Sequence, residues 1–241
     1  EHTHPPSRET KKKKWSTMAK AKLSIIQWNC EGARAKAGEL EKMATELRPY
    51  CICLQETKLR PEASFSIPRY KPFLQNLELR PGGYAHGGVG ILVQKHVSVY
   101  QIPLQTPLQA VAVSVKVHKR ISLCSLYLPP GTNIRKEHLT GLLDQLPKPY
   151  MVLGDFNARS TLWYENEDNP RGTMIVEVIA ENDVFILDED KNTHMSRRIG
   201  TLDSHIDLSI CSTELLSLFK WDVQTDTRGS DHYPITISSI E

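Results

Sequence analysis

The chain has 241 residues, of which 39% are hydrophobic, and a formal net charge of +2. A chain of this length can bury a full core, most simply as one domain. No apolar run approaches the roughly 18 to 20 residues that a membrane-spanning helix needs, and the charged N-terminal stretch lacks the apolar core of a signal peptide. We therefore expect neither a transmembrane helix nor a secretory signal.

The charge is unevenly distributed along the chain. Residues 1–22 carry seven basic and two acidic side chains, a net charge of +5, so the remaining residues sum to −3. We interpret residues 1–22 as a basic flexible tail, which is either an unstructured arm or a phosphate-binding or nuclear-targeting segment, and assign residues 23–241 to one domain. Because the domain has no overall basic field, local patches must hold any polyanion.

The chain has five cysteines, an odd number: Cys30, Cys51, Cys53, Cys124 and Cys211. Most of them lie in apolar, strand-like runs, and their spacing matches no zinc-ligand motif. We interpret them as reduced, buried side chains of an intracellular protein.

The hydrophobic pattern alternates between strand-like and helix-like runs. Strands are expected at residues 23–28, 51–55, 87–93, 110–117, 121–128, 150–153, 184–187, 205–210 and 233–238. Apolar residues at helical spacing indicate helices around residues 35–48, 139–146 and 175–179. Residues 110–128 contain a charged turn and indicate a hairpin. This mixture favours an α/β fold in which two mixed sheets pack face to face, with the helices outside.

Most of the predicted strands end in a side chain that can bind a cation, donate to an oxyanion or move a proton. After the strand at 150–153, Gly154 permits a sharp turn, and Asp155 and Asn157 then point the same way because side chains alternate along an extended chain. The other polar strand ends are Asn29, Glu56, Tyr127, Asp207, Asp231 and His232. Any one of them alone is typical of turn chemistry, but their recurrence indicates a common site.

Three motifs are the most specific: Gln55-Glu56-Thr57-Lys58-Leu59, Gly154-Asp155-Phe156-Asn157 and Gly229-Ser230-Asp231-His232-Tyr233-Pro234. Their order resembles the endonuclease/exonuclease/phosphatase superfamily, to which exonuclease III and the apurinic/apyrimidinic endonucleases belong. The resemblance runs from about Leu23 to Ile240. It implies a four-layer α/β sandwich of the exonuclease III/DNase I-like type and a metal-dependent phosphodiesterase activity.

The resemblance also implies a metal site. Such enzymes use an oxygen-ligated hard cation, which we expect to be Mg²⁺, with Mn²⁺ able to substitute. Glu56 matches the metal carboxylate of the family. Asn29 beside it is either a ligand or an orienting amide, and Asp231 is expected to be a further acid near the metal.

The remaining polar strand ends correspond to the reacting groups of the family. Asp155 matches the residue that orients or deprotonates the attacking water, and Asn157 holds Asp155 and contacts the phosphate. Tyr127 is expected to place its hydroxyl near the scissile phosphate, or else to pack on the prolines that follow it. His232 is expected to donate to a non-bridging oxygen and to remain cationic because it pairs with Asp207.

Four further segments narrow the resemblance within the superfamily: residues 87–93, 157–163, 169–172 and 192–194. They resemble the endonuclease domains that begin the polyproteins of jockey-like and site-specific insect non-LTR retrotransposons. This implies that the domain nicks double-stranded chromosomal DNA in the nucleus, leaving a 3′-hydroxyl primer for a downstream reverse transcriptase. The alternatives are an abasic-site repair endonuclease, another phosphodiesterase or phosphatase of this fold, or a member used only for binding.

Abasic-site repair enzymes hold a flipped-out sugar with aromatic residues of the loop that corresponds to residues 195–203. Here this loop contains no aromatic side chain, which weakens an abasic-site role.

Four basic residues are candidate DNA contacts. Arg197 and Arg198, at the tip of an expected hairpin, either enter a minor groove, clasp phosphates or remain solvated. Lys58 and Arg60, just beyond Glu56, are expected phosphate contacts.

Overall fold

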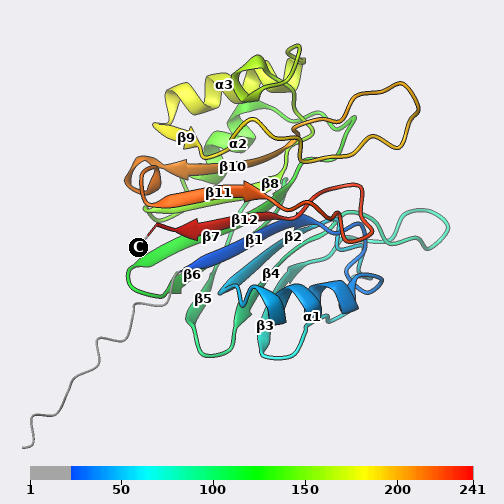
Figure 1. Ribbon diagram of the computed structural model, residues 1–241, viewed down its shortest axis with the longest axis vertical. Coiled ribbons are helices and arrows are strands. Elements are labelled where there is room, and N and C mark those ends of the chain that lie inside the picture. The colour runs from blue at the N-terminus through cyan, green and yellow to red at the C-terminus, as the bar shows by residue number, and fades with distance from the viewer. Residues whose placement is uncertain (1–22, 241) are drawn as a thin grey trace, which may run out of the picture.

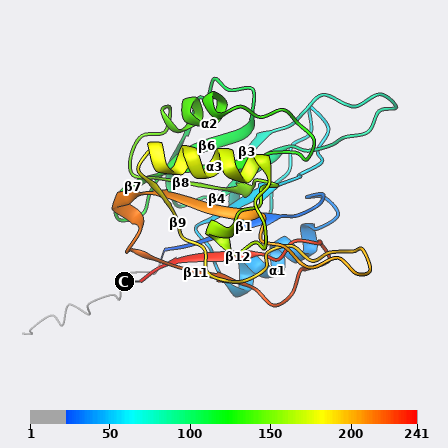
Figure 2. The same cartoon turned by 90° about the horizontal axis from the view of Figure 1, so that it is seen from above.

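The computed structural model describes residues 23–240, so the predicted basic tail lies outside the described residues. Two six-stranded mixed sheets pack face to face (Figures 1 and 2). The first has the order β11 (Phe219–Val223), β12 (Ile235–Ser239), β1 (Ser24–Asn29), β2 (Cys51–Gln55), β4 (Val89–Gln94) and β3 (Tyr70–Gln75). The second has the order β5 (Ser98–Ile102), β6 (Gln109–Lys116), β7 (Arg120–Tyr127), β8 (Tyr150–Asp155), β10 (Asp207–Ser212) and β9 (Val184–Ile186).

Helices cover the outer face of each sheet. Helix α1 (Ala37–Glu46) buries Leu40 and Met43 against the first sheet. Helices α2 (Lys136–Leu143) and α3 (Pro170–Glu181) cover the second sheet, and two short 3₁₀ turns lie at Thr161–Trp163 and Thr213–Leu215. The predicted four-layer sandwich is confirmed. None of the described helices is long and apolar enough to span a membrane.

Three strands were not predicted, and all three lie at the edge of a sheet: β3, β5 and β11. Strand β3 lies between residues 55 and 87, where no strand was predicted. An edge strand is solvated on one side and carries polar residues or proline, so its hydrophobic pattern is weak. Strand β3 contains Pro72, and β5 exposes Tyr100.

The core lies in three layers, one between the sheets and one under each set of helices. All five cysteines are buried within it, as predicted. Two buried glutamines cross the space between the sheets. Nε2 of Gln27 in β1 donates to the carbonyls of Gly154 (3.1 Å) and Leu208 (3.2 Å), and Nε2 of Gln55 donates to Oγ of Ser125 (2.9 Å). These bonds fix the sheets against each other beside the strand ends that carry the polar motifs.

Candidate active site

The strand register brings the predicted site residues together at one end of the sandwich. Asp155 pairs with Tyr127 across the parallel β7–β8 ladder and with Asp207 across the antiparallel β8–β10 ladder. From the first sheet, Nδ2 of Asn29 donates to Oδ2 of Asp155 at 2.9 Å. Asp155 lies in a cleft of about 310 Å³, which is lined by Glu31, Glu56, Pro130, Asp155, Asn157, Arg159, His194, Ser204, Ile206, Asp231 and His232.

The end of β8 requires its glycine. A Cβ on Gly154 would lie 2.0 Å from the carbonyl oxygen of Leu126, so no other residue fits without moving β7. Asn157 then adopts a left-handed conformation with φ of 48°. In this turn both its backbone N–H (3.0 Å) and its Nδ2 (2.8 Å) donate to Oδ1 of Asp155. Asn157 therefore fixes the orientation of the Asp155 carboxylate.

Asp155 is buried among other charged groups. Burial raises the pKa of Asp155 to about 7; the His232 ring, whose Nε2 lies 3.9 Å from Oδ2, opposes this shift, whereas Asp207 and Glu56 add to it. A carboxylate with a pKa near neutrality can accept a proton from a water molecule. A divalent cation beside it would favour its ionised form.

His232 and Asp207 form a buried pair, with Nδ1 of His232 2.7 Å from Oδ2 of Asp207. Burial lowers the pKa of His232, but the Asp207 carboxylate outweighs it, and the resulting pKa is about 10. His232 is therefore a cation at neutral pH, with its Nε2 edge toward the cleft.

The segment that carries His232 is anchored to β1. Nε1 of Trp28 donates to the carbonyl of His232 (3.0 Å), and Oγ of Ser230 donates to the carbonyl of Asn29 (2.8 Å). Oγ of Ser230 also accepts from the backbone N–H of His232 (3.2 Å). These bonds join two motifs that lie about two hundred residues apart in sequence, and they set the position of His232.

Glu56 is held ionised at the other wall of the cleft. The hydroxyl of Tyr127 donates to its Oε1 (2.7 Å), and Nζ of Lys58 lies 3.0 Å from its Oε2. Burial opposes ionisation of Glu56, but these donors outweigh it and lower its pKa. Lys58, predicted to contact DNA, is thus paired with Glu56 in this structure.

The donor set suits a hard divalent cation. Oxygen ligands are available from Glu56 and Asp155, which Asn29 bridges through its amide, at 3.5 Å and 2.9 Å respectively. Asn29 orients both carboxylates through Nδ2, while its Oδ1 accepts from the Glu31 backbone N–H (3.2 Å). Asp231, also predicted near the metal, lies in the same cleft beside His194 and His232.

The two arginines of the loop at residues 195–203 differ in their partners. Arg197 binds Glu31 through two guanidinium nitrogens (3.1 and 2.5 Å), and its Nε lies 3.5 Å from Oδ2 of Asp231. Arg198 and Arg60 are exposed, and the described structure gives neither side chain an ion-pair partner. A bridge between His194 and Ser204 closes the loop, which projects from the same end of the sheets as the loops before β4 and β12 (Figure 1).

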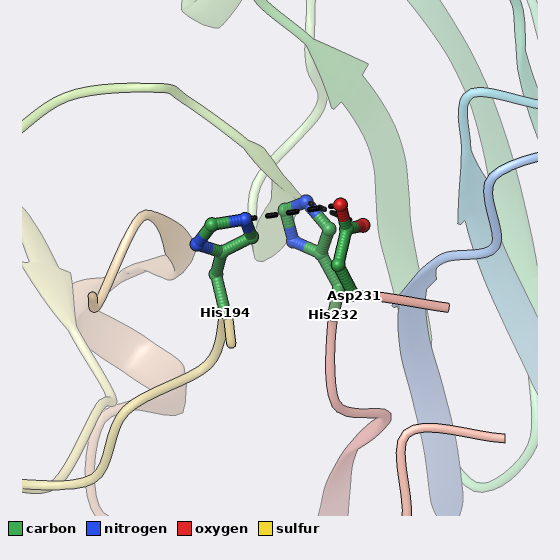
Figure 3. A group of neighbouring side chains, drawn as sticks. All are labelled: His194, Asp231 and His232. Atoms are coloured by element: carbon green, nitrogen blue, oxygen red, sulfur yellow. Dashed lines mark ion pairs between the residues drawn. The ribbon is translucent and has the colours of Figure 1, made fainter. Parts of the chain in front are cut away.

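Three ionisable cleft residues were missed by the sequence predictions: Glu31, Arg159 and His194. Arg159 and His194 lie in segments that carried the family resemblance, but their spacing gave no signal of a role. The ring of His194 lies against that of His232, with centroids 4.8 Å apart (Figure 3). Only the tertiary structure brings these residues to the site.

The chain is similar to known proteins along most of its length. The model of the family described as endonuclease-reverse transcriptase matches residues 121–236. The probable RNA-directed DNA polymerase from transposon BS of Drosophila melanogaster is 26% identical over 229 residues, and the RNA-directed DNA polymerase from mobile element jockey of the same species is 25% identical over 225 residues. Each match covers 90% of this chain and 24% of the relative, so the chain spans about a quarter of these relatives.

Solved structures share the fold. The endonuclease domain of TRAS1, a telomere-specific non-LTR retrotransposon, has a TM-score of 0.74 and 24% identity, covering 90% of this chain and 98% of that domain. The AP endonuclease LMAP from Leishmania major has a TM-score of 0.72 and 14% identity, covering 90% and 87%.

The fold is that of the nucleases among these solved structures, so the predicted exonuclease III/DNase I-like fold is confirmed. The family match over residues 121–236 agrees with the predicted class of enzyme. Within that superfamily, the chain is similar to the endonuclease domains of non-LTR retrotransposons, as its motifs indicated.

Proposed function

We propose that this domain is a magnesium-dependent endonuclease that nicks one strand of double-stranded DNA and leaves a 3′-hydroxyl. The observation that carries the proposal is that Asp155, His232 and an ionised Glu56 line one cleft, with Asp207 bonded to His232. A proton acceptor, a cationic donor and an oxygen-donor cation site are what phosphodiester hydrolysis requires.

Each side chain has a distinct part in the proposed reaction. Asp155, oriented by Asn157, accepts a proton from the attacking water as that water approaches phosphorus. His232 donates from Nε2 to a non-bridging oxygen, where negative charge grows, and Asp207 keeps it cationic. Glu56 would hold the metal, with Asn29 and Tyr127 fixing that carboxylate; when bound, the cation supplies Lewis-acid stabilisation of the phosphate oxygens.

The similarity to retrotransposon proteins supports a more specific role. The relatives are described as RNA-directed DNA polymerases of mobile elements, and TRAS1 as a telomere-specific non-LTR retrotransposon. We propose that the nick primes reverse transcription of such an element at a chromosomal target. The partner would then be a reverse transcriptase of the same polyprotein, and the site of action would be the nucleus.

The test is a nicking assay on supercoiled plasmid with Mg²⁺ added or removed by EDTA. The purified chain is expected to convert supercoiled to open-circular DNA only with the metal. DNA ligase should then reseal the nick, because ligase joins a 3′-hydroxyl to a 5′-phosphate. Asp155→Ala should abolish conversion, whereas Asp190→Ala, a change of an exposed acid away from the cleft, should not.

Two further substrates separate the alternatives. An oligonucleotide with one abasic site and a small phosphate monoester are incubated under the same conditions. Cleavage confined to the abasic oligonucleotide would support a repair endonuclease, and turnover confined to the monoester would support a phosphatase. DNA binding without cleavage of any substrate would leave the binding-only alternative.

A further inference from the structure

Two imidazoles and one carboxylate that line the cleft converge on one another (Figure 3). Nε2 of His194 lies 4.0 Å from Oδ2 of Asp231, and Nε2 of His232 lies 3.8 Å from Oδ1 of the same carboxylate. The three ligand atoms lie within 4.8 Å of one another. The side chains of His194 and Asp231 are 24% and 23% exposed, so an ion in solution can reach them.

The other ring nitrogen of each histidine already has a partner. Nδ1 of His232 lies 2.7 Å from Oδ2 of Asp207, and Nδ1 of His194 lies 3.0 Å from Oγ of Ser204. Metal-binding histidines are typically held this way, with one nitrogen bonded to a carboxylate or hydroxyl so that the other faces the ion. The two rings are thus fixed with Nε2 toward Asp231.

We propose that His194, His232 and Asp231 form a binding site for a transition metal ion of the Zn²⁺ class, which shares the Asp231 carboxylate with the expected Mg²⁺ site, and that its occupation blocks nicking. Two imidazoles and one carboxylate suit Zn²⁺ far better than Mg²⁺, which prefers oxygen ligands and bound water. Inhibition rests on the function proposed above, because the ion would occupy the Nε2 atom of His232 that donates to the phosphate.

The geometry requires an adjustment of the side chains. Zinc ligands at about 2.0–2.1 Å in a tetrahedron lie roughly 3.4 Å apart, so the spacings of 4.0 and 3.8 Å from the histidines to Asp231 must shrink by about half an ångström, and any ligand spacing near the 4.8 Å limit by about 1.4 Å. Arg197 competes for Asp231, but its guanidinium also binds both oxygens of Glu31 and can remain there. The ion must also displace the proton on Nε2 of His232, which sets an affinity below that of a dedicated structural site.

The other group of metal-binding side chains in the described part of the chain, Asp155, Asp207 and His232, is buried. All five cysteines are buried. His2 and His4 near the N-terminus could bind zinc on their own. The parent chain for both measurements below therefore carries His2→Ala and His4→Ala. Within that background, His194→Ala removes one ligand, and His96→Ala removes an exposed histidine from the turn between β4 and β5 as the matched control.

Direct binding is measured first, because it does not depend on nuclease activity. Zn²⁺ is titrated against a chromogenic chelator, and Co²⁺ is added separately to follow the intense visible absorption that a four-coordinate site produces. The parent and His96→Ala chains are expected to bind one ion and give this spectrum. His194→Ala should weaken binding by at least about tenfold and lose the spectrum. Equal binding by the parent and His194→Ala chains would overturn the proposal.

Nicking with Mg²⁺ held constant and Zn²⁺ increased is the second measurement. Each rate is expressed relative to the rate of the same chain in Mg²⁺ alone, and on this scale His194→Ala should need at least about tenfold more Zn²⁺ for half-inhibition than the parent. Inhibition at the same zinc concentration in both chains would refute the inhibitory site. If no chain nicks DNA, the proposed function fails, and the binding measurement alone decides whether the zinc site exists.

Discussion

The domain contains two buried histidine–aspartate pairs that differ in their surroundings. His232 and Asp207 are 2.7 Å apart, and His205 and Asp188 are 3.0 Å apart. The side chains of all four residues are at most 7% exposed. The distance and the chemistry of the two pairs are therefore nearly the same.

The two histidine–aspartate pairs differ in the groups that surround them. His232 lines the cleft, with Asp155 and Asp231 within 4 Å of its Nε2. His205 is instead enclosed between the rings of Trp221 (centroids 5.7 Å apart) and Tyr164 (6.2 Å), away from the cleft. The comparison teaches that a buried His–Asp pair indicates function only when one ring edge reaches a cavity; otherwise it secures the fold.

The largest effect on activity is expected from the first pair. His232→Ala removes the donor to the phosphate and should lower the nicking rate by about 10²- to 10³-fold, the usual cost of losing one such donor. Single-turnover rates on plasmid DNA and thermal melting measure it. The functional role of the His232–Asp207 pair would be contradicted if His232→Ala mainly lowered the melting temperature while its folded fraction nicked at the wild-type rate.

The largest effect on stability is expected from the second pair. His205→Ala leaves the Asp188 carboxylate buried without its partner and should lower the free energy of unfolding by about 3–5 kcal/mol. Urea denaturation measures it, and the folded protein should nick at near the wild-type rate. A loss of activity as large as that of His232→Ala, with unchanged stability, would contradict the structural role.

A smaller effect of opposite sign, an increase in stability, is expected from replacing Asp155. This third buried ionisable group lies beside the His232–Asp207 pair only. Its folded pKa of about 7 exceeds its usual 3.8, so folding favours the protonated form. The cost of burying the carboxylate is absent below pH 3.8, grows as the pH rises and is complete above about 7. Asp155→Asn should therefore stabilise the metal-free protein by about 1 kcal/mol or more at alkaline pH.

Denaturation in EDTA across this pH range tests the sign. The difference between Asp155→Asn and wild type should widen from acid to neutral pH. A constant difference, or destabilisation at every pH, would show that the buried carboxylate is not the cause.

The smallest effect is expected from Arg198, which belongs to neither pair. Arg198→Ala should weaken DNA binding only a few-fold and reduce the slope of log affinity against log salt by about 1. Arg197→Ala, by contrast, releases Glu31 and Asp231 in the cleft and should also change the nicking rate. Filter binding at several salt concentrations measures the affinity of both variants, and plasmid assays measure their nicking rates. Equal affinities and equal nicking rates in the two variants would mean that the ion pairs of Arg197 are unimportant.

Much of the fold could be predicted because central strands and packed helices carry clear periodicity. The predicted hairpin at residues 110–128 is β6 and β7, and the three apolar stripes are α1, α2 and α3. Edge strands β3, β5 and β11 escaped because half of each is solvated. The last two predicted strands begin two residues later than expected, at Asp207 and Ile235.

The site could be predicted where a functional side chain ends a buried strand. Asp155, Asp207 and Tyr127 share one register across three strands, and His232 pairs with Asp207 as expected. The Asp188–His205 pair could not be predicted, because its meaning depends on which rings enclose it. The same holds for His194, which reaches the cleft only because the loop at residues 195–203 folds back.

The position of β12 has a consequence for how the domain forms during synthesis. Strand β12 lies between β11 and β1, so the β1 edge that it covers stays open until β12 has been synthesised. The motif with His232 immediately precedes β12. We expect a nascent chain that stops short of Ile235 to expose an open β1 edge and to lack an assembled cleft. The nuclease would then gain its activity only after nearly the whole domain has left the ribosome.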